Sequence, residues 1–129
     1  MSIRNKILII EDEPDVLTYL EILFQDNGYD TIGAYDGVTG LKIAQSEKPD
    51  LITLDITMPG QSGIAAYCQY KKDSNIHNIP VVIITATADS ISSYHERLQN
   101  FPSPEGFVTK PINPEELLKK ISSIFSAQH

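Results

Sequence analysis

The sequence is poor in the residues on which several common classes of protein depend. It has a single cysteine, Cys68, so no internal disulfide framework can form and a reducing compartment is expected. Only 10 lysines and arginines stand against 17 aspartates and glutamates, which gives a formal net charge of -7. Such a chain has no basic stripe to neutralise a phosphate backbone. We therefore expect no direct binding of nucleic acid.

Long apolar runs are also missing. The longest uninterrupted runs fall far short of the roughly 20 residues that a membrane-spanning helix needs. No apolar targeting segment follows Met1, and no low-complexity tract or internal repeat occurs. We expect a cytoplasmic protein without a membrane partner, folded as a single domain over residues 1–129.

What the sequence does contain is a regular alternation of short apolar runs and helical patterns. Continuous apolar runs are typical of strands covered on both faces, and they predict strands at residues 6–10, 31–35, 51–54, 81–84 and 106–109. Apolar residues at helical spacing follow each strand, and helix ends are marked by Pro14, Asn27-Gly28, Lys48-Pro49 and Asn113-Pro114. The fourth helix is expected around Ile91, Tyr94 and Leu98.

This alternation predicts an α/β fold, a doubly wound parallel sheet of the (βα)5 type with right-handed crossovers. Periodicity alone does not give the strand order. The order 2-1-3-4-5, known from flavodoxin-like folds, would make the first and third strands neighbours and would place a binding site between their carboxyl ends.

Polar residues follow four of the predicted strands directly. They are Glu11-Asp12, Asp55, Thr85 and Lys110. Because the carboxyl ends of parallel strands point to one edge of a sheet, these side chains should converge there. Three carboxylates repel one another unless a cation neutralises them, and hard oxygen ligands suit Mg²⁺. The pattern predicts an acidic Mg²⁺ site with a nucleophile and a phosphate clamp.

The residues around these positions form four motifs. They are Ile9-Ile10-Glu11-Asp12-Glu13-Pro14, Leu54-Asp55-Ile56-Thr57-Met58-Pro59-Gly60 with Gly63, Ile84-Thr85-Ala86 and Val108-Thr109-Lys110-Pro111. Together they resemble the motifs of the receiver domain of two-component response regulators. The resemblance covers essentially the whole chain. It implies a phosphorylation-activated signalling domain without an attached output module, which is not an enzyme but catalyses its own phosphorylation and dephosphorylation.

The resemblance also implies a metal cofactor, Mg²⁺. Asp12 and Asp55 would hold the ion directly, together with the backbone carbonyl of Thr57. Glu11 would act mainly through water. Hard oxygen donors in small number leave open positions for phosphate oxygens, as Mg²⁺ prefers.

A reaction follows from the same resemblance. Asp55 would be the phosphoacceptor and would take the phosphoryl group from a histidine kinase or a histidine phosphotransfer protein. Lys110 would pair with the phosphoryl oxygens, and the Thr85 hydroxyl would bond them once transfer is complete. The peptide bond between Lys110 and Pro111 is predicted to be cis, to aim the ammonium into the site.

Signalling would depend on a switch between two packed states. When the Thr85 hydroxyl moves toward the phosphate, the aromatic ring of Phe107 could turn inward and alter the surface of the fourth helix, fifth strand and fifth helix. An unknown downstream protein would read that surface. Residues 100–106 depart from the usual receiver pattern and contain two prolines, which restrict the backbone just before the fifth strand.

Three alternatives remain at this point. A phosphatase of the haloacid dehalogenase type also combines Asp, Thr and Lys on such a sheet, but it normally has a second Asp where this chain has Thr57. A flavin-binding module would need a hydroxyl- and glycine-rich first loop, which here is acidic. The chain could also be the receiver of a larger transcriptional regulator or hybrid kinase.

Overall fold

The computed structural model describes residues 4–56, 62–86, 99–100 and 102–128. Its five strands form one parallel sheet in the order β2-β1-β3-β4-β5, which confirms the predicted fold class and strand order. The strands are β1 (Lys6–Ile10), β2 (Asp30–Ala34), β3 (Leu51–Asp55), β4 (Val81–Thr85) and β5 (Gly106–Thr109). The helices described are α1 (Pro14–Asp26), α2 (Gly37–Glu47), α3 (Ser62–Lys72) and α5 (Pro114–Ala127). The predicted fourth helix lies outside the described residues.

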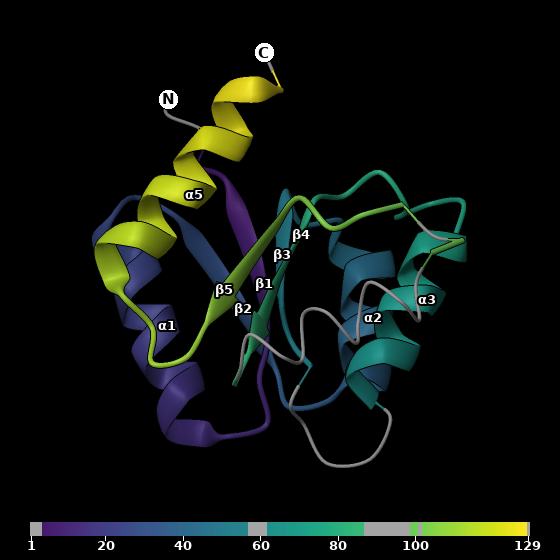
Figure 1. Ribbon diagram of the computed structural model, residues 1–129, viewed down its shortest axis with the longest axis horizontal. Helices are drawn as coiled ribbons and strands as arrows, with labels where there is room; N and C mark the ends of the chain where they lie inside the picture. Colours follow the sequence, from purple (N-terminus) through teal and green to yellow (C-terminus); the bar gives the residue numbers. More distant parts are fainter. Residues whose placement is uncertain (1–3, 57–61, 87–98, 101, 129) are drawn as a thin grey trace.

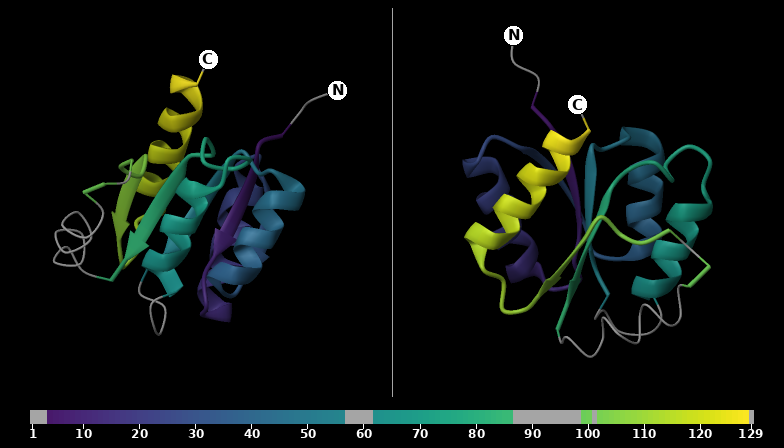
Figure 2. Two further views of the ribbon diagram at one scale, coloured as in Figure 1. Left: turned by 90° about the vertical axis from the view of Figure 1, so that its right-hand side faces the viewer. Right: turned by 45° about the horizontal axis from the view of Figure 1, so that its top comes forward.

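Helices cover both faces of the sheet. Figure 1 shows α1 and α5 on one face and α2 and α3 on the other, and the views in Figure 2 show the same layers from two further directions. Successive residues of β1 point to opposite faces, so Leu8 and Ile10 enter the core beneath α2 and α3, while Ile7 and Ile9 enter the core beneath α1 and α5. Burial on both faces explains why this strand is apolar throughout.

The helix ends follow local sequence signals. The Asn113 side chain caps α5 by accepting a hydrogen bond from the Glu116 amide at 3.1 Å, and Pro114 occupies the first turn, as predicted. Gly28 follows α1 with a φ of +93°, a conformation that glycine adopts without strain.

Some details differ from the sequence-based expectations. The second strand begins at Asp30 rather than Thr31. The apolar spacing of α5 predicts that Leu118 and Ile124 also face inward, but both are only partly buried, because the inward stripe follows Leu117, Ile121 and Phe125. The apolar stripe of α3 predicts that Cys68 is a buried small hydrophobe, but this residue lies at the margin of the core and is only partly buried.

Tyr67 and Tyr70 lie three residues apart on α3, a spacing that fits either a core or a partner surface, and the structure places both in the core. No helix within the described ranges combines the length and the apolar character required to cross a membrane.

We predict that Gly40→Ala destabilises the protein. A methyl group at Gly40 would lie 2.5 Å from Ile10 Cδ1 and 2.6 Å from the Tyr70 hydroxyl oxygen, which itself donates to the Gly37 carbonyl at 3.0 Å. Overpacking of this kind costs about 1–3 kcal/mol, more than the roughly 1 kcal/mol that alanine gains over glycine in a helix. Urea denaturation would measure the loss. Tyr70→Phe in the same background should recover part of it, whereas a more stable Gly40→Ala variant would contradict the packing argument.

Candidate functional site

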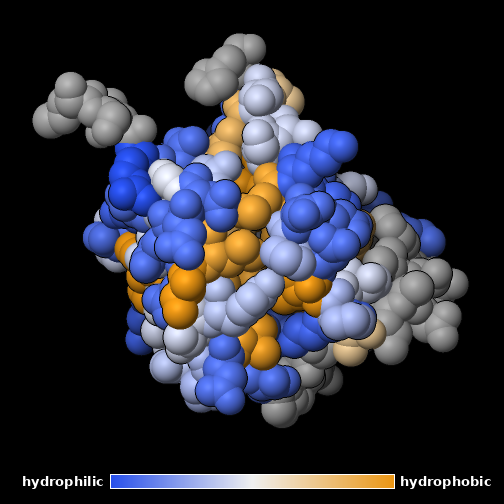
Figure 3. Space-filling model, turned by 90° about the vertical axis from the view of Figure 1, so that its left-hand side faces the viewer, coloured by the Kyte–Doolittle hydropathy of each residue, from blue (hydrophilic) through white to orange (hydrophobic). Residues whose placement is uncertain are grey.

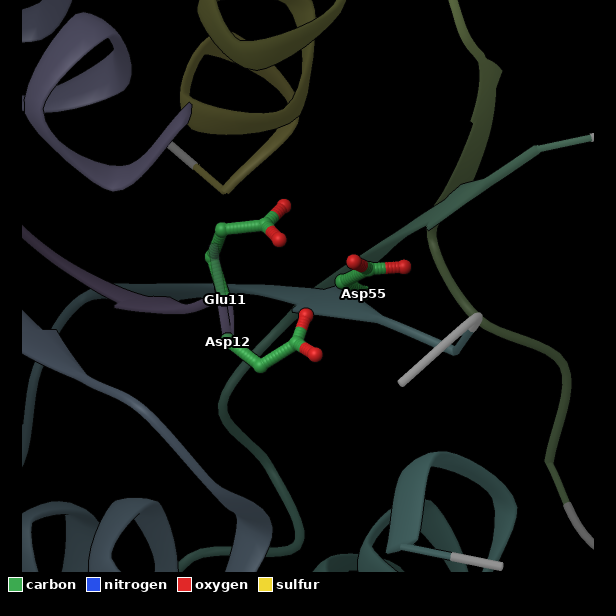
Figure 4. Close-up of side chains that lie close together, drawn as sticks. All are labelled: Glu11, Asp12 and Asp55. Carbon is green, nitrogen blue, oxygen red and sulfur yellow. The ribbon is translucent and has the colours of Figure 1, made fainter. Parts of the chain in front are cut away.

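The polar residues predicted to converge do meet at the carboxyl edge of the sheet. Glu11 and Asp12 follow β1, and Asp55 ends β3, which pairs with β1 in the register Ile10 to Leu54. Figure 4 shows the three carboxylates close together on these neighbouring strands. One oxygen of each lies within 4.8 Å of the others. Parallel pairing of β1 with β3 therefore brings three carboxyl groups into one small volume.

Lys110 supplies the positive charge at this cluster. Its Nζ lies 3.2 Å from Asp55 Oδ2 and 3.4 Å from Glu11 Oε1, so one ammonium bridges two carboxylates. The Lys110 amide donates to the Thr85 carbonyl at 2.8 Å, which ties the loop after β5 to the end of β4. The peptide between Lys110 and Pro111 is cis, as predicted.

The two carboxylates that face Lys110 are almost completely buried. Glu11 and Asp55 are each 1% exposed. Burial, together with the hydrogen bond and charge of Asp55, raises the pKa of Glu11 to about 8, and the Glu13 amide and the Lys110 ammonium offset this only in part. Burial disfavours the charged form of Lys110, but the charges of Asp55 and Glu11 outweigh it and raise the pKa of the lysine.

A hard divalent cation fits this arrangement. Glu11 Oε1 is buried and makes no hydrogen bond, although Lys110 Nζ lies near it, and three carboxylate oxygens are close enough to share one ion. Oxygen ligands of this kind, few in number, match the preference of Mg²⁺. The predicted carbonyl ligand of Thr57 lies outside the described residues.

Thr85 and Phe107 lie on one face of the β4–β5 pair. Thr85 is fully buried at the end of β4 and is paired with Thr109, while Phe107 pairs with Ile83 two residues earlier. Residues two apart on a strand share a face, so both side chains point toward the core beneath α2 and α3. Phe107 packs against that core and is only partly buried.

An apolar surface beside the site was not predicted from the sequence. A hollow of about 300 Å³ is lined by Asp15, Val16, Tyr19, Lys110, Pro111 and Ile112. Tyr19 is 43% exposed and Ile22, one turn further along α1, is 53% exposed. Figure 3 shows apolar atoms gathered on this side of the molecule, over α1 and α5. The only sign of this surface in the sequence is that Tyr19 and Ile22 lie outside the row of α1 residues that faces the core.

Comparison with known proteins agrees with this geometry. The model of the response regulator receiver domain family matches residues 7–122. Protein PilH of Pseudomonas aeruginosa is 32% identical over 94% of this chain and 98% of its own length. The alkaline phosphatase synthesis transcriptional regulatory protein PhoP of Bacillus subtilis is also 32% identical, but the chain spans only 48% of it.

Solved structures show the same fold. The chemotaxis protein CheY4 of Vibrio cholerae superposes with a TM-score of 0.82 at 26% identity, covering 94% of this chain and 98% of that protein. These similarities favour the receiver over a haloacid dehalogenase phosphatase. The chain belongs to the family of response regulator receiver domains.

Proposed function

We propose that this receiver is phosphorylated on Asp55 and that Glu11, Asp12 and Lys110 make the transfer possible. Receiver domains take phosphoryl groups from histidine kinases or phosphotransfer proteins and bind Mg²⁺ at an acidic pocket. The observation that carries the proposal is the Lys110 ammonium, 3.2 Å from Asp55 Oδ2 at the rim of a buried acidic cluster.

The chemistry needs positioning more than covalent assistance. A carboxylate oxygen of Asp55 attacks the phosphorus atom, and the bond between phosphorus and the nitrogen of the donor histidine breaks. The electron pair of the broken bond stays on the imidazole. Lys110 then stabilises the charge on the phosphoryl oxygens. Bound Mg²⁺, held by Asp12 and Asp55 with Glu11 nearby, would supply further charge neutralisation at those oxygens. The domain thus accelerates its own modification.

We predict that Asp55 is the only stoichiometric phosphorylation site and that labelling needs a divalent cation, because the carboxylates otherwise repel the phosphoryl group. Phosphoramidate with Mg²⁺ should add one phosphoryl group to the wild type by intact mass, and chelator should prevent it. Asp55→Asn should remain unlabelled. Asp26→Asn, at an exposed residue that ends α1, is the matched control. Labelling of Asp55→Asn at the wild-type rate would exclude Asp55 as the acceptor.

The apolar hollow beside Lys110 is the surface on which we propose that the phosphodonor docks. It adjoins the acceptor, since Lys110 lines the hollow and contacts Asp55. Exposed Tyr19 and Ile22 extend it along α1 and offer apolar area that an approaching helix of the donor could bury.

We predict that Tyr19→Ala slows phosphorylation by a protein donor without slowing phosphorylation by phosphoramidate. The small donor needs only the acceptor site, whereas the protein donor also loses buried aromatic area, which costs about tenfold or more at interfaces. The histidine kinases of the source organism would be purified, autophosphorylated and tested singly to find the donor. Tyr35→Ala, which changes another exposed tyrosine (56%), serves as the control. Equal slowing with both donors would reject the docking surface.

The response to phosphorylation, we further propose, passes through Thr85 and Phe107. Their side chains share one face of adjacent strands, so movement of the Thr85 hydroxyl toward the phosphate changes the space open to the Phe107 ring. A population shift between two ring positions would then alter the surface around β5 and α5 that a downstream protein reads.

We predict that beryllium fluoride, whose fluorides stand in for phosphoryl oxygens on Asp55, changes the NMR environment of Phe107 more than that of α1. Thr85→Ala should still form the beryllium fluoride complex but should show no change in the Phe107 signals, because the variant lacks the hydroxyl that moves. Thr109→Ala, at the exposed partner of Thr85 on β5, is the control. Changes confined to the loops around Asp12 and Asp55 would instead favour a phosphate reservoir without a switch.

A further inference from the structure

A nearly buried lysine far from the acidic cluster has no part in the function described so far. The side chain of Lys71, in the last turn of α3, is only 4% exposed. Its Nζ lies 3.8 Å from Glu105 Oε1, donates to the His77 carbonyl at 3.3 Å and stands 5.7 Å from the centre of the Tyr67 ring. Lysine is rarely buried unless it is paired, because the ammonium loses its hydration. The contacts of Lys71 must therefore offset the lost hydration, and the question is what they hold in place.

The partner of Lys71 anchors the start of β5. Glu105 Oε1 accepts a hydrogen bond from the Val81 amide at 2.6 Å, and the Glu105 amide donates to the Val81 carbonyl at 3.0 Å. This double attachment comes directly before the first residue pair of the two strands, Val82 and Gly106. Glu105 therefore helps to set the register of β5, and a slip of one residue would turn every side chain of the strand to the other face.

Tyr67 holds the same segment one turn earlier on α3. Its ring is fully buried, and its hydroxyl donates to the Pro102 carbonyl. Burial, with the charge of Glu105 nearby, raises the pKa of Tyr67, so the hydroxyl keeps its proton and remains a donor. Figure 1 shows the chain before β5 reaching across to α3. Two side chains on one side of α3 thus fasten the segment that leads into β5.

The opposite end of α3 rests on the phosphoacceptor strand. A Cβ at Gly63 would lie 2.5 Å from the Cα of Ile56, the residue after Asp55, so the first turn of α3 touches the backbone there without an intervening side chain. At its other end α3 holds the segment before β5, and β5 is only four residues long before Lys110 follows. The single helix α3 therefore contacts both the residue that follows Asp55 and the segment that leads through β5 to Lys110.

We propose that α3 is a brace that sets the position of Lys110 relative to Asp55, with Lys71 and Tyr67 as positioning residues for phosphoryl transfer. The inference rests on the proposed function of Asp55 and names residues that take no part in the chemistry. Because a misplacement of about 1 Å at a reacting group can cost up to about a hundredfold in rate, weak anchors far from the site can matter.

Lys71→Met tests the brace, since methionine keeps an apolar stem and removes the ammonium. Lys72→Met, at the exposed neighbouring lysine, is the matched control. With phosphoramidate and saturating Mg²⁺, Lys71→Met should be phosphorylated about tenfold more slowly. Mg²⁺ affinity should stay within about twofold, because the carboxylates are carried by β1 and β3, whose pairing does not involve β5. The nitrogen NMR resonance of the Lys110 ammonium should shift, and Lys71→Arg should restore part of the rate.

A second variant serves if Lys71→Met fails to fold. Glu105→Gln keeps a carbonyl oxygen for the Val81 amide and removes only the charge opposite Lys71, and it should also slow phosphorylation and shift the Lys110 resonance. The brace would be rejected if the variants lost only stability toward urea, while the phosphorylation rate and the Lys110 resonance stayed as in the wild type. The ion pair between Lys71 and Glu105 would then be purely structural. An equal loss of Mg²⁺ affinity and rate would overturn it as well. Failure of the proposed function is distinguishable, because wild-type Asp55 would then remain unlabelled.

Discussion

The parallel register between β1 and β3 is the constraint on which the site depends. Pairing of Ile10 with Leu54 brings the residues after these two strands together, and both strands are buried on both faces. Buried carboxylates repel one another and lose hydration, so the arrangement is unfavourable until a cation approaches. Lys110 offsets part of this cost by bridging Glu11 and Asp55. The fold thus holds an acidic cluster that favours a cation, and the phosphoryl group that we propose for Asp55 would be held through that cation and Lys110.

The sequence predicts the fold well because its signals are local. Continuous apolar runs and helix caps fall within short windows, and the meeting of Asp12, Asp55 and Lys110 follows from strand ends in a parallel sheet. Tyr19 and Ile22 carry no such signal, since single exposed apolar residues are common on protein surfaces. These residues are recognised as part of an apolar surface only in the folded structure, where the hollow beside Lys110 forms.

The contacts of α3 could not be predicted from periodicity. Tyr67 and Pro102 are 35 residues apart, and their hydrogen bond depends on the path of the chain between them. The sequence shows only that the segment before β5 departs from the usual receiver pattern and is stiffened by prolines. It does not show where the segment lies, because an ion pair such as Lys71 with Glu105 arises from tertiary packing.

The prolines and the anchors have complementary effects. Pro102 and Pro104 have no amide hydrogen to donate, so the segment cannot be held by a regular ladder of backbone hydrogen bonds. Side chains take over that role, with Tyr67 bound to the Pro102 carbonyl and Glu105 bound to Val81. Restricted backbone angles lower the entropy that the segment loses when it is fastened. In the brace that we propose, a shift of β5 would pass through this segment to α3 and so link the region around Lys110 to Ile56, the residue after Asp55.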